Sequence, residues 1–127
     1  LLFREPLVWV GAAAHEAWRR EPLPVAVYEA GSRARKDAIA ALAAQRRAYR
    51  LVYDSSSLAG QIAAVESGLA VAVLTRCSAP PHLVQLDARH GLPPLPELEV
   101  AVVRSRASAR SAAADAMEEQ FVRTLAR

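Results

Sequence analysis

The 127-residue sequence lacks several features that would place it in other protein classes. Its single cysteine, Cys77, excludes an internal disulfide framework and fits a reducing, cytoplasmic location. No apolar run reaches the roughly 18 residues that a membrane helix needs, and the first residues lack the basic-then-apolar order of a signal peptide. Position 1 is Leu, not Met, and the first residues already suit a strand, so we expect a truncated N-terminus.

Sequence motifs for nucleotide binding, metal binding and catalysis are also missing. The chain contains no GxGxxG, GxxxxGK[ST], GxSxG, HExxH or CxxC pattern. We expect His15, His82 and His90 to be loop residues, because their spacing suits neither a metal site nor a nucleophile–base pair. The sequence therefore predicts no metal and no cofactor, and it favours binding over catalysis.

The charged residues are scattered and only slightly unbalanced. There are 16 Lys and Arg against 13 Asp and Glu, which gives a net charge of +3. Excess positive charge can attract nucleic acid, but short Arg clusters of this kind are more typical of solvated helix faces. With 53% hydrophobic residues, the chain is expected to fold as one small globular unit.

Short apolar runs alternate with segments of helical periodicity. Strands are predicted at residues 7–10, 25–28, 49–53, 70–74, 83–86 and 98–103, and helices at residues 34–47, 58–67 and 107–125. This alternation predicts an α/β fold with a mainly parallel sheet flanked by helices. The long irregular connection between residues 75 and 97 suggests a chain that leaves one subdomain and returns to another.

Two strand-to-helix turns carry groups suited to ligand binding. At Gly31-Ser32, free backbone N–H groups and the helix dipole favour an anion, and Arg33 or Arg35 could add positive charge. The second turn is the Asp-Ser-Ser-Ser segment at residues 54–57. Ligands of open α/β sheets bind outside the carboxyl ends of strands, where both turns would lie. Simple helix capping explains the same residues equally well, so both interpretations stay open.

Four phrases, in this order, resemble the effector-binding domain of LysR-type transcription regulators. They are REPLVWV (residues 4–10), GSRARK (31–36), SLAGQIAAVESGLAVAVL (57–74) and LPELEVAVVR (95–104). Ala70 stands where that family usually has a second Gly. The resemblance covers nearly the whole chain, and its details are similar to the branch that contains the LrhA, PecT and HexA regulators.

The resemblance implies a two-lobed fold like that of type 2 periplasmic binding proteins. Residues 1–10 would form the first hinge strand, residues 11–96 the second lobe, and residues 97–127 the return hinge strand and the C-terminal helix of the first lobe. The family's N-terminal winged helix-turn-helix and most of the first lobe would be absent. The chain would then reach DNA only through a domain it lacks, and one cleft wall alone would bind a ligand weakly.

The implied function is that of an allosteric sensor and not of an enzyme. A small effector, expected to be an anion, would bind between the lobes and modulate DNA binding by the full-length dimer or tetramer. The expected effector-binding residues are Tyr28, Gly31, Ser32, Ser55 and Ser56. The expected hinge residues are Val10, Gly11 and Val102, and a possible oligomer interface comprises Ile62, Val65 and Leu69, which could equally be core.

Two other functions share this fold. A periplasmic solute-binding protein would need a secretion signal upstream of Leu1, and the regulator-like phrases count against it. A fragment of a deaminase or dehydratase would need an acid–base or nucleophile set, which the sequence does not supply.

Overall fold

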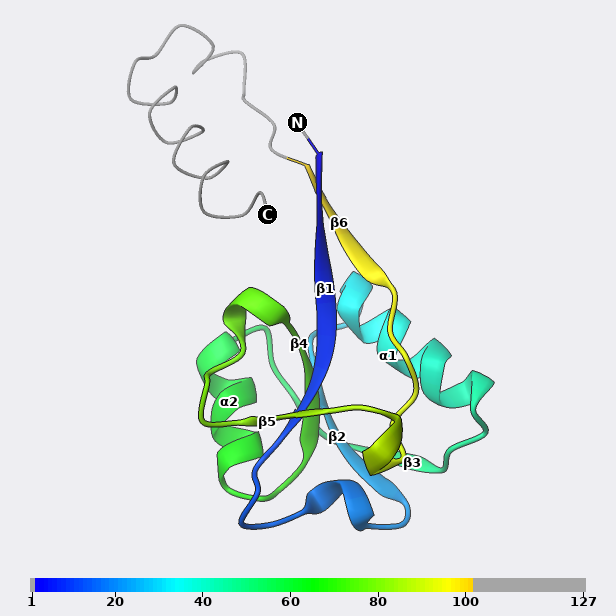
Figure 1. The fold of residues 1–127 in the computed structure, drawn as a ribbon, viewed down its shortest axis with the longest axis vertical. Helices are drawn as coiled ribbons and strands as arrows, with labels where there is room; N and C mark the ends of the chain where they lie inside the picture. Colours follow the sequence, from blue (N-terminus) through cyan, green and yellow to red (C-terminus); the bar gives the residue numbers. More distant parts are fainter. Residues whose placement is uncertain (1, 102–127) are drawn as a thin grey trace, which may run out of the picture.

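The computed structural model describes residues 2–101, which form a six-stranded sheet and two α-helices (Figure 1). The strands are β1 (Leu2–Gly11), β2 (Leu23–Val27), β3 (Tyr49–Asp54), β4 (Val71–Thr75), β5 (Val84–Leu86) and β6 (Glu97–Ala101). The helices are α1 (Arg33–Ala44) and α2 (Leu58–Glu66), with short 3-10 helices η1 (Ala17–Arg19), η2 (Arg76–Ser78) and η3 (Ala88–His90). The helix predicted at residues 107–125 and the expected hinge residue Val102 lie outside the described residues.

The sheet joins a parallel part to an antiparallel part in the order β3-β2-β4-β1-β5. Strands β3, β2 and β4 are parallel, whereas β1 runs antiparallel to β4, β5 and β6. Strand β1 changes partners between Pro6 and Leu7: residues 2–6 pair with β6, and residues 7–11 pair with β4 or β5. The predicted α/β architecture is confirmed. The sheet is mixed because β1 precedes the β2-α1-β3-α2-β4 crossovers and runs against their direction.

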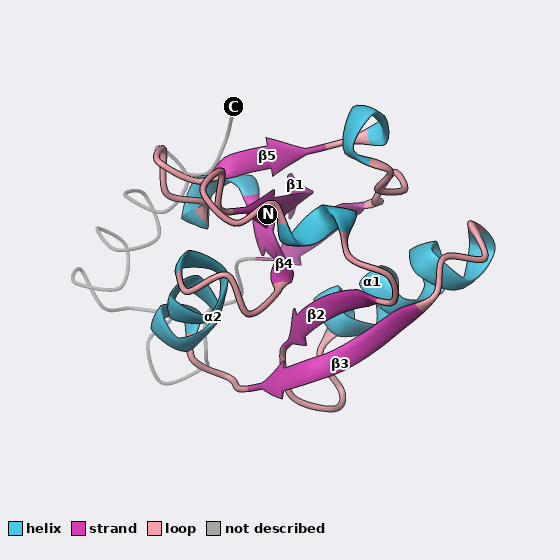
Figure 2. Cartoon of the chain, turned by 90° about the horizontal axis from the view of Figure 1, so that it is seen from below, coloured by secondary structure: helices cyan, strands magenta, loops and turns pink. Residues whose placement is uncertain are grey.

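Hydrophobic clusters cover both faces of the sheet, and the two α-helices lie on opposite sides of it (Figure 2). Alternate residues of β1 supply the two clusters, as the two-residue repeat of a strand requires. Trp9 lies in the same hydrophobic cluster as Leu42 of α1, while Val10 lies in the same cluster as Val65 of α2. The Trp9 indole Nε1 also donates a hydrogen bond to the carbonyl oxygen of Pro93 at 3.0 Å. This bond holds the returning chain against the sheet.

Serine side chains cap the N-termini of both helices, as the sequence predicts. The Ser32 hydroxyl accepts from the backbone N–H of Arg35 at 3.3 Å, and the Ser57 hydroxyl accepts from Gly60 N at 3.2 Å. Gly68 follows α2 with a φ of 79°, a left-handed conformation in which glycine avoids the strain of a side chain. These caps set the positions of the two helix starts relative to the strands before them.

The buried face of α2 is rotated from the one that its apolar residues suggest. The helix buries Gln61, Ala64 and Val65, whereas Leu58 and Leu69 are 39% and 44% exposed. The small Ala64 allows α2 to lie close to the sheet, and the amide of Gln61 finds backbone partners there. None of the helices within residues 2–101 is both long and apolar enough to span a membrane.

Candidate functional site

The carboxyl ends of β2, β3 and β4 lie along one edge of the sheet. Thr75, the last residue of β4, pairs with Leu7 of β1, next to the point where the β1–β6 ribbon begins. Figure 1 shows this edge on the side of the sheet from which the ribbon extends. The edge therefore lies on the same side of the sheet as the β1–β6 ribbon.

Arg35 joins the two polar turns at this edge. Its Nη1 atom donates to the carbonyl oxygen of Tyr28, just after β2, at 3.0 Å, and to Oδ2 of Asp54, the last residue of β3, at 2.8 Å. Ser32 belongs to the same helical turn as Arg35, and Ser55 directly follows Asp54. The structure thus brings Tyr28, Ser32 and Ser55 to one edge, as the sequence predicts for turns at strand carboxyl ends.

Gly31 and Ser56 are exposed residues of the same two turns. Gly31 has a φ of 96°, and the turn closes through a hydrogen bond from Ser32 N to the Glu29 carbonyl oxygen. The role of Gly31 at this position is conformational, because its φ is one that residues with a side chain rarely adopt. Ser56 lies between Ser55 and the helix cap Ser57.

Gln61 is a buried polar residue of the site that the sequence prediction missed. Its Nε2 atom donates to the carbonyl oxygens of Val27 at 2.8 Å and Ser55 at 3.0 Å, so it ties the ends of β2 and β3 together. Its Oε1 atom is buried and has no hydrogen-bond partner among the described residues. The available signal was a polar residue four positions before Val65, on the same helical face.

The serine hydroxyls at the edge accept hydrogen bonds and keep their own O–H groups as donors. Ser32 and Ser57 each accept a backbone hydrogen bond as helix caps, and the Ser55 hydroxyl accepts from Ser57 N at 3.0 Å. A hydroxyl that accepts in this way still has its own O–H to donate. The edge therefore offers several donors to a ligand that carries acceptor atoms.

Two further groups set the charge at the edge. Burial raises the pKa of the Tyr28 phenol, so this side chain is neutral at physiological pH and can donate through its O–H. Arg35 and Asp54 form an ion pair in which the Arg35 side chain is 21% exposed and the Asp54 side chain is 58% exposed. The Arg35 side chain, which carries the positive charge, is thus more buried than the Asp54 carboxylate side chain.

A buried carboxylate connects the ribbon to the end of β4. Glu5 of β1 is 7% exposed, and its Oε1 atom accepts from the backbone N–H of Cys77 at 2.8 Å. The Thr75 hydroxyl donates to the Ser78 hydroxyl at 2.8 Å in the same turn. These bonds fix the turn after β4 against the part of β1 that pairs with β6.

The expected hinge residues Val10 and Gly11 lie inside the sheet. Val10 is fully buried, and Gly11 pairs with Val84 of β5, at the opposite end of β1 from the ribbon. A methyl group at Gly11 would lie 2.9 Å from Cε3 of Trp18, so this glycine permits close packing inside the lobe. The change of strand partners in β1 lies farther toward its start, between Pro6 and Leu7.

The three residues of the expected oligomer interface differ in how far they are buried. Val65 is fully buried in the core cluster on the α2 side and cannot contact another subunit. Ile62 packs against the same cluster and is partly buried, while Leu69 is 44% exposed. Of the three residues, Leu69 offers the most surface to a partner.

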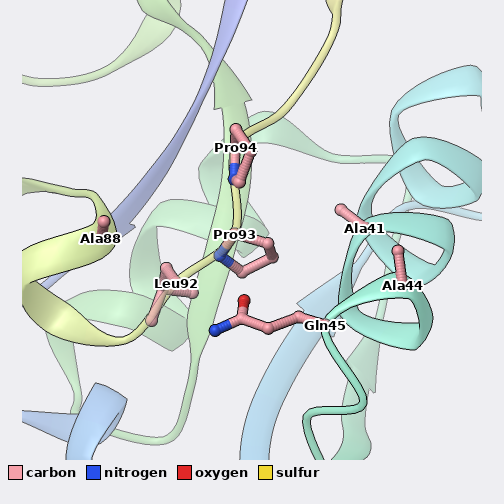
Figure 3. Close-up of a pocket in the computed structure, with 7 residues that line it drawn as sticks. All are labelled: Ala41, Ala44, Gln45, Ala88, Leu92, Pro93 and Pro94. Carbon is pink, nitrogen blue, oxygen red and sulfur yellow. The ribbon is translucent and has the colours of Figure 1, made fainter.

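Surface hollows lie elsewhere on the described residues. Figure 3 shows one of about 370 Å³ between α1 and residues 92–94, with the Gln45 side chain at its rim. Two others, of about 440 Å³ and 410 Å³, lie beside the start of β2 and beside β1. The predicted effector residues line none of these three hollows. Among residues 2–101, no group of three His, Cys, Asp or Glu side chains is arranged to hold a metal ion.

Comparison with known proteins gives a consistent family assignment. Residues 1–126 match the protein family described as LysR substrate binding domain. The chain is 42% identical over 103 residues to the HTH-type transcriptional regulator DgdR of Burkholderia cepacia, covering 79% of this chain and 34% of DgdR. The chain thus spans about a third of the length of that relative.

Solved structures show the same fold at low identity. The full-length structure of HypT from Salmonella typhimurium, a hypochlorite-specific LysR-type transcriptional regulator, matches with a TM-score of 0.63 and 16% identity, over 98% of this chain and 45% of HypT. The Synechocystis PCC6803 CcmR regulatory domain in complex with 2-PG matches with a TM-score of 0.60 and 15% identity, over 98% of this chain and 65% of that domain.

Proposed function

Because the chain belongs to the LysR substrate binding domain family, we propose that it is the effector-sensing part of a bacterial transcription regulator. The regulator DgdR, to which the chain is 42% identical, is about three times as long as the matched part. We assign DNA binding and assembly into dimers or tetramers to the longer protein. The family match and this relative favour a regulator over the solute-binding and enzyme alternatives.

The proposed ligand is a small anion that binds at the carboxyl edge of β2 and β3. The observation that carries this proposal is the convergence of donors there: the Ser32 and Ser55 hydroxyls and the Arg35 guanidinium lie on two turns that Arg35 itself joins. Carboxylate or phosphate oxygens match such donors. Tyr28, Gly31 and Ser56 complete the proposed site. The CcmR domain in complex with 2-PG supports small-molecule binding by this fold.

The proposed mechanism is a change in lobe arrangement. Residues 1–10 and 97–127 belong to the hinge strands and first lobe, and residues 11–96 to the second lobe that carries the site. A ligand bound between the lobes favours one arrangement in proportion to its differential affinity for the two. We place the bend of β1 between Pro6 and Leu7, where its partners change, and keep Val102 as the matching position on the return strand.

The remaining assignments follow from the same family. We propose that the protein acts in the cytoplasm, has no enzymatic activity and needs no cofactor or membrane. Ile62 and Leu69, joined by the exposed Leu58, are the proposed contribution of α2 and the turn after it to an oligomer interface. The branch of LrhA, PecT and HexA is the proposed place of the chain within the family.

Calorimetric titration of the intact regulator with inorganic phosphate and small carboxylates tests the proposed site. The informative variant is Ser32→Asp, because Asp also caps a helix but adds negative charge and removes a donor. We expect anion binding to weaken at least tenfold while the melting temperature stays within a few degrees. Ala40→Glu adds the same charge on the exposed middle of α1 and should bind normally. Unchanged affinity in Ser32→Asp would remove this turn from the site.

A further inference from the structure

The guanidinium of Arg35 is shared between a fixed partner and a removable one. Nη1 carries two hydrogens, and both are used: one by the Tyr28 carbonyl oxygen at 3.0 Å and one by Asp54 Oδ2 at 2.8 Å. The carbonyl belongs to the backbone and cannot leave. The Asp54 side chain is 58% exposed, against 21% for Arg35, so rotation of Asp54 into solvent would release one hydrogen-bond position on a guanidinium that stays in place.

Asp54 also lies beside the donors of the proposed site. It directly precedes Ser55, and its partner Arg35 is held in the first turn of α1 by the Ser32 cap. An anion at these hydroxyls would be attracted by Arg35 and repelled by Asp54 over nearly the same distance. The two charges would largely cancel, and the anion would gain little from Arg35 unless Asp54 moved away.

We propose that Asp54 is a specificity-determining residue that occupies Arg35 in the empty site and selects ligands able to displace it. This inference rests on the proposed function, that the edge binds a small anion. Exposed ion pairs are weak, so displacement is possible. An oxyanion with more acceptor oxygens than the two of a single carboxylate can replace the lost carboxylate and also bind the serine hydroxyls. A single carboxylate such as acetate only replaces the Asp54 carboxylate that it displaces, so it gains little. The selected ligand class is therefore multidentate oxyanions, such as phosphate esters or dicarboxylates.

The test is a calorimetric titration of the intact regulator with inorganic phosphate and with acetate. Asp54→Asn keeps the shape of the side chain and removes its charge. We expect acetate to bind roughly tenfold more tightly, phosphate to gain less, and the preference for phosphate over acetate to fall. Glu16→Gln is the matched control, because Glu16 forms a similar exposed ion pair with Arg19 in the loop before β2. This control should leave both affinities unchanged.

A double variant tests whether Asp54 affects acetate binding through Arg35. In Arg35→Gln combined with Asp54→Asn, the gain in acetate affinity should disappear, because Asp54 acts through Arg35. If that protein does not fold, Arg35→Lys retains the charge with a different donor geometry and should reduce the gain.

Three results would overturn the inference. They are equal gains in Asp54→Asn and Glu16→Gln, an unchanged selectivity in Asp54→Asn, and a full gain that survives replacement of Arg35. A wild-type protein and variants that all fail to bind either anion would overturn the proposed anionic effector as well, so the two failures are distinguishable.

Discussion

The side-chain amide of Gln61, on α2, donates to the carbonyl oxygen of Val27, the last residue of β2, across 2.8 Å. A second bond from the same nitrogen reaches the Ser55 carbonyl oxygen. Both acceptors are backbone groups at the edge that carries the proposed site. A single buried side chain thus holds two neighbouring strand ends at a defined separation.

Replacing Gln61 with Glu should destabilise the lobe by about 2–4 kcal/mol, because a carboxylate oxygen would face two carbonyl oxygens in a buried position. Gln61→Leu, which loses the bonds without adding charge, should cost about 1–3 kcal/mol. Urea unfolding followed by tryptophan fluorescence measures both. Gln85→Glu, at an exposed position of β5, is the control and should change stability by less than about 0.5 kcal/mol. Equal effects at positions 85 and 61 would contradict the role of the buried amide.

Gly60→Ala should destabilise the protein although alanine favours helices by about 1 kcal/mol over glycine. A methyl group at this position would lie 2.5 Å from the Tyr53 hydroxyl oxygen, so the ring must move. Combining Gly60→Ala with Tyr53→Phe removes the clashing oxygen and should recover at least about 0.5 kcal/mol of the loss. Thermal unfolding of the two single variants and the double variant gives the coupling. Additive effects would show that the Tyr53 hydroxyl is not the reason why position 60 requires glycine.

Gly68→Ala should reduce stability by more than about 1–2 kcal/mol, because the residue has a φ of 79° and its new methyl group would overlap the His15 imidazole. Adding His15→Ala should remove the steric part and leave the backbone part of about 1 kcal/mol. Chemical denaturation measures both parts. If Gly68→Ala leaves the stability unchanged, this turn adopts another conformation in solution.

Glu5→Ala should leave the backbone N–H of Cys77 without its acceptor and cost about 1–3 kcal/mol. Glu5→Gln retains a carbonyl oxygen and should cost less. Amide hydrogen exchange is the sharper measurement: exchange at Cys77 should accelerate in Glu5→Ala and change little in Glu5→Gln. Equal acceleration in both variants would point to a role for the charge rather than for the hydrogen bond.

Much of this architecture was predictable because its signals are local. The strand order along the chain follows from short apolar runs, and Ser32 and Ser57 begin helices as their side chains suggest. The donor-bearing turns also follow from sequence, because the carboxyl ends of parallel strands share an edge. Each of these inferences depends on neighbours within a few residues.

The features that were missed depend on contacts between distant segments. The face of α2 is set by the sheet beneath it and by the carbonyl groups that Gln61 reaches, not by which side chains are most apolar. The hinge was expected at Val10 and Gly11 from the family resemblance. Where β1 stops pairing with β6, at Pro6, does not show in the sequence. A sequence shows that a strand exists but not where it changes neighbours.

The central position of β1 also has a consequence for the order of folding. It precedes the other five described strands along the chain, and its partners β4, β5 and β6 follow much later: Leu7 pairs with Thr75, and Phe3 pairs with Val100. Until those strands exist, an apolar segment has no place in a sheet. Non-local pairing of this kind slows folding, because a long loop must close before any contact forms. We therefore expect a slow folding phase that ends when β1 inserts between β4 and β5, and aggregation of chains that stop before β4.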